Sequence, residues 1–248
     1  RYACYRAYPF NVQPPTDDRP FFGHYFRWSQ AREVLALAGH TWQPFGGAGY
    51  FVLLALLALA TLAAGLLILL PLAVRVKIGR KQKLGATMGY FALLGLGFMF
   101  VEIPLLQRFI LFLGHPAYAM ATVLFALLLF SGLGSLISRC VPLKLALLSI
   151  PALIGGYALG LPALFEMTLA APLWGRLVVA VLALIPLGLS LGMPFPRGLA
   201  LLGESQTLVA WAWGVNGAVS VVASILAALV ALSWGFSVVL VAGAICYL

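Results

Sequence analysis

From residue 48 onward the chain is a series of long hydrophobic runs separated by short polar breaks. Each run is close to the ~20 residues that one helical crossing of a lipid bilayer needs. The runs are continuous, whereas the strands of a membrane β-barrel alternate apolar and polar positions, so a β-barrel is excluded. The pattern predicts an all-α fold, a polytopic transmembrane helix bundle of about seven crossings.

The polar breaks place the crossings along the sequence. We expect them at residues 50–74, 84–113, 117–138, 145–161, 174–193 and 207–232, with a last crossing from Phe236 onward. Residues 162–173, which include Glu166, are predicted to be a loop, and residues 194–198 a turn. Residues 1–47 lack helical periodicity over most of their length. The chain therefore divides into an irregular connector, 1–47, and a transmembrane helical domain, 48–248.

The composition agrees with a protein embedded in a membrane. Of the 248 residues 63% are hydrophobic and 8% are charged, against the roughly 25% charged residues of an ordinary soluble domain. The formal net charge is +9, and five of the 15 basic residues lie between the first two crossings: Arg75, Lys77, Arg80, Lys81 and Lys83. Basic loops of membrane proteins face the cytoplasm, so this loop sets the orientation and does not indicate nucleic-acid binding.

Three polar side chains lie inside the second crossing, in sequence that otherwise carries almost no charge: Glu102, Gln107 and Arg108. An ionisable group at membrane depth is costly and usually faces a bundle interior or a wet cavity, where it has a partner. Glu102 and Arg108 are separated by ~9 Å of helical rise but by about 240° around the helix, so they are not an ideal pair. Either a kink at Pro104 reorients them, or each has its partner on another helix.

The sixth crossing begins with Trp211, Trp213 and Asn216 close together. One interpretation is an aromatic box for a substrate. The other is a tryptophan belt at the membrane interface, with a hydrogen bond from the buried amide to another helix. The candidate residues for binding a substrate or a proton are therefore Glu102, Gln107, Arg108, Trp213 and Asn216.

Glycine spacings predict where helices pack closely, because small residues let two helix backbones approach. These positions are Gly132 and Gly134 at the end of the third crossing, Gly156-x-x-x-Gly160 in the fourth and Gly188-x-x-x-Gly192 in the fifth. The adjacent Asp17 and Asp18 predict a turn or a helix cap rather than a metal site.

Patterns typical of catalytic or metal sites do not occur in the sequence. The cysteines Cys4, Cys140 and Cys246 are far apart, with no CxxC pair and no nearby histidine, so neither a disulfide framework nor a metal site is indicated. No nucleophile and base pair is recognisable. We therefore assign no catalytic residue, no metal ligand and no cofactor site, and leave enzyme activity open.

Five stretches carry a family resemblance: TDDRPFF, GFMFVEIPLLQRFILFLGHPAYAMATVLF, GLGSLIS, LGMPFPRGL and AWAWGVNGAVSVVAS. Together they resemble the carboxyl-terminal membrane half of large bacterial spermidine-synthase-like proteins, over nearly the whole chain. In that family an aminopropyltransferase-type domain is combined with polytopic segments distantly like the major facilitator superfamily. The resemblance implies the fold of one half of a transporter in a bacterial inner membrane, with residues 1–28 as the tail of the soluble domain.

The resemblance does not carry the enzyme activity to this chain. The glycine-rich cofactor loop and the catalytic acid of an aminopropyltransferase are not in the sequence, which starts with Arg1 and is expected to be a piece of a longer protein. If the basic loop is cytoplasmic, one crossing at residues 50–74 puts residues 1–47 outside, where S-adenosyl cofactors are not expected. Three explanations stay open: the upstream domain is not an active synthase, the first crossing is re-entrant, or the charge rule misleads.

Two functional hypotheses follow from the residues and the resemblance. The first is a membrane module that binds or translocates a small cationic solute such as a polyamine, with Glu102 as the buried counter-charge. A cation that approaches a lone carboxyl group favours release of its proton, which couples binding to protons. The alternative is a non-transporting scaffold that anchors a catalytic domain or serves a larger membrane complex. The expected partners are the lipid bilayer, a small cationic solute and other membrane subunits.

Overall fold

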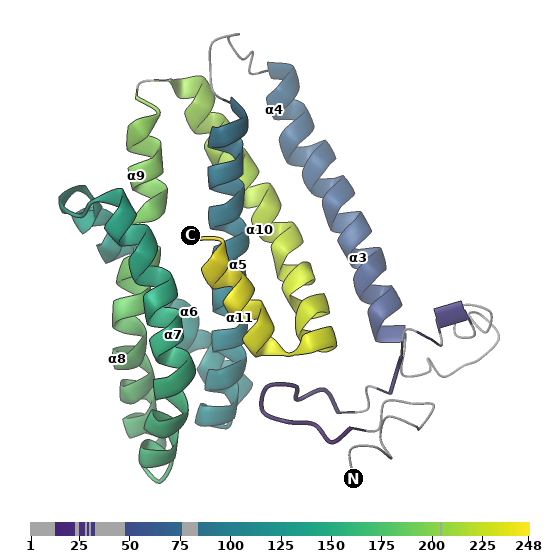
Figure 1. Cartoon of the computed structure of the whole chain (residues 1–248), viewed down its shortest axis with the longest axis vertical. Helices are drawn as coiled ribbons and strands as arrows, with labels where there is room; N and C mark the ends of the chain where they lie inside the picture. The colour runs from purple at the N-terminus through teal and green to yellow at the C-terminus, as the bar shows by residue number, and fades with distance from the viewer. Residues whose placement is uncertain are drawn as a thin grey trace.

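The structure is a computed structural model, and it describes residues 13–22, 25–27, 29, 31–32, 48–75, 84–203 and 205–248. These residues form an all-α bundle, shown in Figure 1. Its elements are α3 (Ala48–Ala64), the π-helical turn η2 (Gly65–Leu69), α4 (Leu70–Arg75), α5 (Leu84–Leu113), α6 (Pro116–Ile137), the 3₁₀ turn η3 (Ser138–Cys140), α7 (Leu143–Thr168), α8 (Leu173–Leu191), α9 (Pro194–Leu201), α10 (Gln206–Trp234) and α11 (Phe236–Ile245).

Six helical stretches are long and apolar enough to cross a membrane: Gly49–Arg75, Gly85–Leu113, Pro116–Cys140, Leu143–Thr168, Leu173–Leu201 and Gln206–Trp234. The seventh apolar helix, α11, has 10 residues and is shorter than a full crossing. The chain is therefore an integral, multi-pass membrane protein whose spans contact the lipid bilayer, and the predicted fold class is confirmed.

Two of the predicted breaks are wrong, because proline does not interrupt the helices there. α7 runs to Thr168 with Pro162 in its interior, so Glu166 is helical and does not lie in a loop. Neighbouring helices and local adjustments of the backbone let membrane helices keep an internal proline. Residues 194–198 begin α9, with Pro194 in the first helical turn, where its missing N–H leaves no helical hydrogen bond unmade.

The first crossing is one continuous helical segment, from α3 through η2 to the end of α4 at Arg75. This continuity excludes the re-entrant explanation for the position of the connector. Residues 13–22 lie near the start of α3, at the end of the bundle opposite α4 (Figure 1). Most of the connector and residues 76–83 of the basic loop lie outside the described residues, so the predictions about them stay predictions.

The central helix of the bundle is α5, which contacts α6, α8, α9, α10 and α11. Its side chains Val101, Leu105 and Phe109 are fully buried and recur every four residues, so one face of the helix lies in the core along its length. Pro104 lies inside α5 without ending it. α3 lies at the edge of the bundle, packed mainly on α10, and most of its side chains face outward.

Helices α6 and α8 pack closely against each other, and glycine makes this approach possible. A Cβ atom at Gly134 would collide with the backbone of Leu189, and one at Gly192 with the backbone of Ser131. Gly188 likewise faces the Cβ of Phe130. The packing role predicted for the third and fifth crossings is therefore confirmed at these three glycines.

The other predicted glycine positions do not mark packing within the chain. No atom lies within 4 Å of a Cβ placed at Gly132, Gly156 or Gly160, and all three residues are exposed. The prediction for the fourth crossing is therefore wrong within this chain. A Gly-x-x-x-Gly spacing shows that a helix has a small-residue face, but it does not show which way that face points.

Candidate functional site

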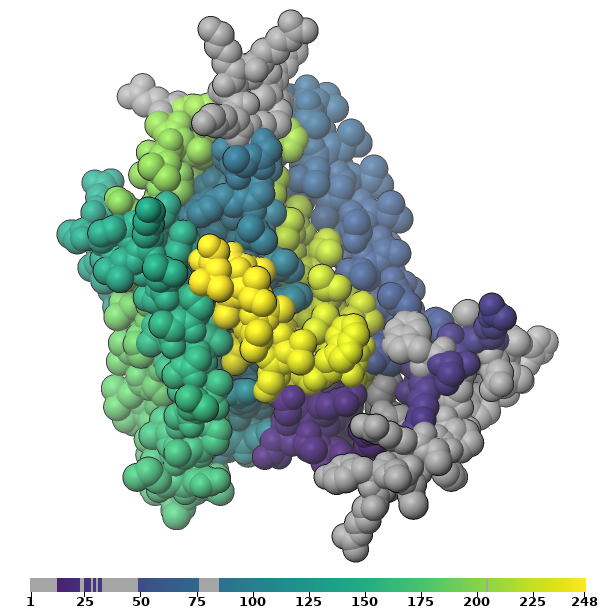
Figure 2. Space-filling view, in the orientation of Figure 1, coloured from purple at the N-terminus to yellow at the C-terminus, as the bar shows by residue number. Residues whose placement is uncertain are grey.

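A short turn from the connector is docked on the membrane bundle. Within residues 16–19 the N–H of Arg19 donates to the carbonyl oxygen of Thr16 at 2.9 Å, and the reverse bond is 3.3 Å. This docked turn rests on the corner between α10 and α11, where Figure 2 shows the purple segment directly against the yellow end of the chain. Two distant parts of the sequence are thereby joined at one end of the bundle.

Asp18 caps the first turn of α11. Its carboxylate Oδ1 accepts hydrogen bonds from the N–H of Ser237 at 2.8 Å and from the hydroxyl of Ser237 at 2.6 Å. Its backbone carbonyl accepts from the N–H of Phe236 at 3.0 Å. The first N–H groups of a helix have no partner inside the helix, and a negative charge is favoured at this end. The helix-cap interpretation of Asp18 is therefore confirmed.

The corner requires glycine. Gly235, which joins α10 to α11, has a φ of +98° and a ψ of 164°, a backbone conformation that is essentially limited to glycine. A Cβ atom at this position would also meet the Oδ2 atom of Asp18. The docked turn thus lies directly against the backbone of the corner.

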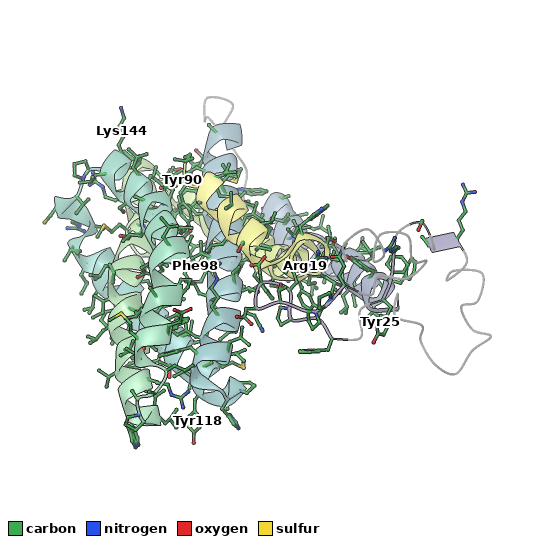
Figure 3. The ribbon with its side chains drawn as sticks, turned by 60° about the horizontal axis from the view of Figure 1, so that its bottom comes forward. Arg19, Tyr25, Tyr90, Phe98, Tyr118 and Lys144 are labelled. Carbon is green, nitrogen blue, oxygen red and sulfur yellow. The ribbon has the colours of Figure 1, made fainter. Side chains whose placement is uncertain are left out.

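Arg19 attaches the docked turn to the other side of the corner. Its guanidinium donates to the backbone carbonyls of Ser233 at 2.9 Å and Leu232 at 3.4 Å, in the last turn of α10 (Figure 3). The last carbonyl groups of a helix have no helical partner, and a cation is favoured there. The ring of Phe21 packs on that of Phe236, with centroids 5.6 Å apart. Asp18 and Arg19 of the docked turn thus make hydrogen bonds to the start of α11 and to the end of α10.

Arg108 joins this arrangement from α5. Its Nη2 atom donates to the hydroxyl oxygen of Ser237 at 3.1 Å, and the same hydroxyl donates to Asp18. The serine therefore bridges a guanidinium and a carboxylate that come from segments far apart in the sequence. The expectation that Arg108 has its partner on another helix is confirmed.

The side chains of Asp18, Arg108 and Ser237 line a cavity of about 340 Å³, which we call the Arg108 cavity. Its polar lining is Asp17, Asp18, Arg108 and Ser237, and its apolar wall is Leu111, Ala158, Leu161, Pro162 and Phe165. Asp17 is exposed, so the cavity reaches the aqueous end of the bundle. An arginine side chain has five N–H donors, and among the described residues Arg108 uses one of them, in the hydrogen bond to Ser237, so that the others are available to a ligand.

Glu102 and Gln107 are half-buried on α5 and line neither this cavity nor the one described next. Neither side chain has a hydrogen bond or ion pair within the part of the chain that the structure describes. Glu102 lies one helical turn from Phe98, on the same face of α5. The structure does not pair Glu102 with Arg108, and the role of Glu102 stays a prediction.

Trp213 and Asn216 come together in a second cavity, of about 480 Å³, which we call the Trp213 groove. The Asn216 amide donates to the backbone carbonyl of Phe91 at 3.1 Å, which joins α10 to α5 and is the hydrogen bond to another helix that one of the two interpretations expected. The ring of Trp213 meets that of Phe195 edge to face, with centroids 4.6 Å apart. The five predicted site residues are thus distributed over two cavities and one stretch of α5.

Comparison with known proteins gives no relative for this arrangement. No protein-family model, no curated protein and no solved structure matches the chain. Among the described residues there is no group of three or more His, Cys, Asp or Glu that is able to hold a metal ion. The fold and the two cavities therefore carry the functional argument.

Proposed function

We propose that this chain is the membrane module of a spermidine-synthase-like protein and that it binds a small amine of net positive charge in the Arg108 cavity. The observation that carries the proposal is the convergence of two carboxylates, a guanidinium and a hydroxyl on one cavity that also has an apolar wall. Sites for small molecules have this composition, a few convergent polar groups in a mostly apolar cleft of roughly 300–1,000 Å³.

The charges of the lining indicate the chemistry of the solute. Asp17 and Asp18 against Arg108 leave one net negative charge, which favours a solute of net charge +1. An ammonium group beside the carboxylates makes charge-assisted hydrogen bonds, and the free donors of Arg108 suit a carboxylate on the same solute. Leu161 and Phe165 provide a surface for methylene groups. A basic amino acid has all three features, whereas a polyamine lacks the carboxylate.

The test is calorimetric binding of lysine and of spermidine to the detergent-solubilised chain. Asp17→Asn removes one charge from the cavity and keeps the size of the side chain, so we expect about tenfold weaker binding of the preferred amine. Glu166→Gln is the matched control, because Glu166 is an exposed acid of α7 that does not line the cavity. Failure of both amines to bind the unaltered chain, or equal binding by both variants, would contradict the proposal.

The Arg108→Gln variant distinguishes an amino acid from a polyamine, because it is expected to change the binding affinity for the two in opposite directions. Glutamine retains an N–H donor for Ser237 and loses the positive charge. If the solute is an amino acid, its carboxylate loses the charged partner and binding weakens. If it is a polyamine, a repulsive charge is removed and binding becomes tighter. No change for either probe would show that the solute does not contact Arg108.

A second function, rigid anchoring of the connector, is favoured by the docked turn itself. If anchoring is the only function, the docked turn holds the corner between α10 and α11 and the Arg108 cavity binds no ligand. The Asp17→Asn variant then gives the same result as wild type in every binding measurement. A role of Glu102 as a counter-charge in translocation is a separate proposal, because Glu102 does not line the Arg108 cavity. Flux of the preferred amine into proteoliposomes that equals wild type in a Glu102→Gln variant would exclude that role.

A further inference from the structure

The Trp213 groove lies between α5, α6, α8, α9 and α10. Its lining comes from α5 (Leu94, Gly95, Phe98), α6 (Leu128, Ser131, Gly132, Ser135), the α8–α9 junction (Leu191, Gly192, Phe195, Pro196), α10 (Trp213, Asn216, Ser220) and the residue Tyr247 after α11. Gly132 leaves open space, because no atom lies within 4 Å of a Cβ placed there. The groove is thus a preformed hollow between packed helices.

The groove is uncharged and faces the bilayer. None of its lining residues carries a charge, and the lining helices belong to the membrane spans. Leu128 and Trp213, on two different helices at its edge, are 67% and 60% exposed. Exposed side chains of a membrane span contact lipid, so a ligand reaches this groove from the hydrocarbon phase. This property separates it from the Arg108 cavity, which is charged and reaches water.

The hydroxyl of Tyr247 in the groove has no hydrogen-bond partner among the described residues. Tyr247 is only 3% exposed, and its hydroxyl makes no hydrogen bond within the described residues, although Tyr90 and Tyr157 each donate to a backbone carbonyl. A hydroxyl without a partner at the wall of a mostly apolar groove favours a ligand that accepts its proton. Asn216 offers a second N–H and its amide oxygen at the same groove.

Aromatic rings make up much of the remaining surface. Phe98, Phe195, Trp213 and Tyr247 all line the groove. Rings of this kind favour a flat, conjugated partner that stacks on them or meets their edges. The unpartnered hydroxyl favours a partner with an acceptor oxygen, and the absence of charge among the lining residues favours a neutral one.

From these observations we propose that the Trp213 groove binds a lipid-soluble planar ring that carries a carbonyl oxygen, the chemistry of a membrane quinone head group. The ring lies among the four aromatic side chains, and the hydroxyl of Tyr247 donates to the carbonyl oxygen. The proposal concerns binding alone. It is independent of the amine site, because the two cavities share no lining residue.

The test is a titration of the detergent-solubilised chain with decylubiquinone, followed by tryptophan fluorescence. We expect saturable quenching that is lost in Trp213→Phe and retained in Trp174→Phe, a control that removes an exposed tryptophan outside the groove. Tyr247→Phe should weaken binding about tenfold, the loss of one hydrogen bond. Gly132→Leu should abolish saturable binding with an unchanged melting temperature, because the leucine side chain fills the empty part of the groove.

Two outcomes would overturn the proposal. One is saturable quenching of equal affinity in wild type, Tyr247→Phe and Gly132→Leu, which would place the quinone elsewhere in the protein or in the micelle. The other is quenching of Trp213 by dibrominated phosphatidylcholine that decylubiquinone does not relieve. That result would show that the groove holds an acyl chain of a phospholipid.

Discussion

Replacement of Gly134 by alanine is expected to destabilise the bundle by about 3 kcal/mol, the upper part of the range for overpacking a core. The added methyl group has no free space, because the position of its carbon is occupied by the backbone carbonyl of Leu189. A backbone atom moves only if the whole of α8 moves with it. The change in the free energy of unfolding is measured by reversible unfolding with sodium dodecyl sulfate in mixed micelles, followed by circular dichroism.

Gly132→Ala is the matched control for this substitution. It lies in the same helix, two positions away, with open space at its Cβ. Alanine at such a position leaves stability unchanged or raises it by up to about 1 kcal/mol, because the unfolded chain loses conformational freedom. Equal destabilisation by the two alanines would mean that the α6–α8 contact does not depend on Gly134.

Asp18→Ala is expected to free the start of α11 at a cost of about 2 kcal/mol, the upper range for loss of a helix cap. The substitution removes the acceptor for both the N–H and the hydroxyl of Ser237. Hydrogen exchange at the Ser237 amide should therefore become about 30-fold faster. The Phe236 amide should change less, because it donates to the backbone carbonyl of residue 18 and not to its side chain.

Two further variants distinguish the effect of losing the capping hydrogen bonds from the effect of losing a negative charge. Asp18→Asn keeps an acceptor oxygen and is nearly as good a cap, so most of the protection of Ser237 should return. Asp17→Ala removes an exposed neighbouring carboxylate and should leave exchange at α11 unchanged. Exchange at Ser237 that is the same in wild type and Asp18→Ala would show that the docked turn does not hold α11.

The membrane fold was predictable because the bilayer limits which sequences can form a crossing. A helix that crosses hydrocarbon must be apolar for about 20 residues, and the break between two crossings must be polar. The second crossing was predicted with the bounds of α5, where a basic loop and Gly114 mark the ends. The prediction failed in α7, because a proline break in sequence was interpreted as the end of a helix that continues to Thr168.

The candidate site was predictable only in part. Arg108 stood out because a charge in an apolar run is rare, and Asp18 was predicted to lie in a turn or to cap a helix, both of which the structure shows. What no local pattern revealed is that the helix capped by Asp18 begins more than 200 residues later, since Asp18 and Ser237 are 219 positions apart. Ser237 was missed for the same reason: a serine in an apolar helix has no feature that indicates the guanidinium and the carboxylate it joins.

Thiol protection at the cavity wall tests the central claim most directly. In a cysteine-free background, Ala158→Cys places a thiol in the Arg108 cavity, and Ala170→Cys places one on an exposed turn outside it. A small membrane-impermeant methanethiosulfonate reagent should label both, and a saturating amine, lysine or spermidine, should slow labelling at position 158 alone. Labelling at position 158 that is the same with and without both amines would contradict the account.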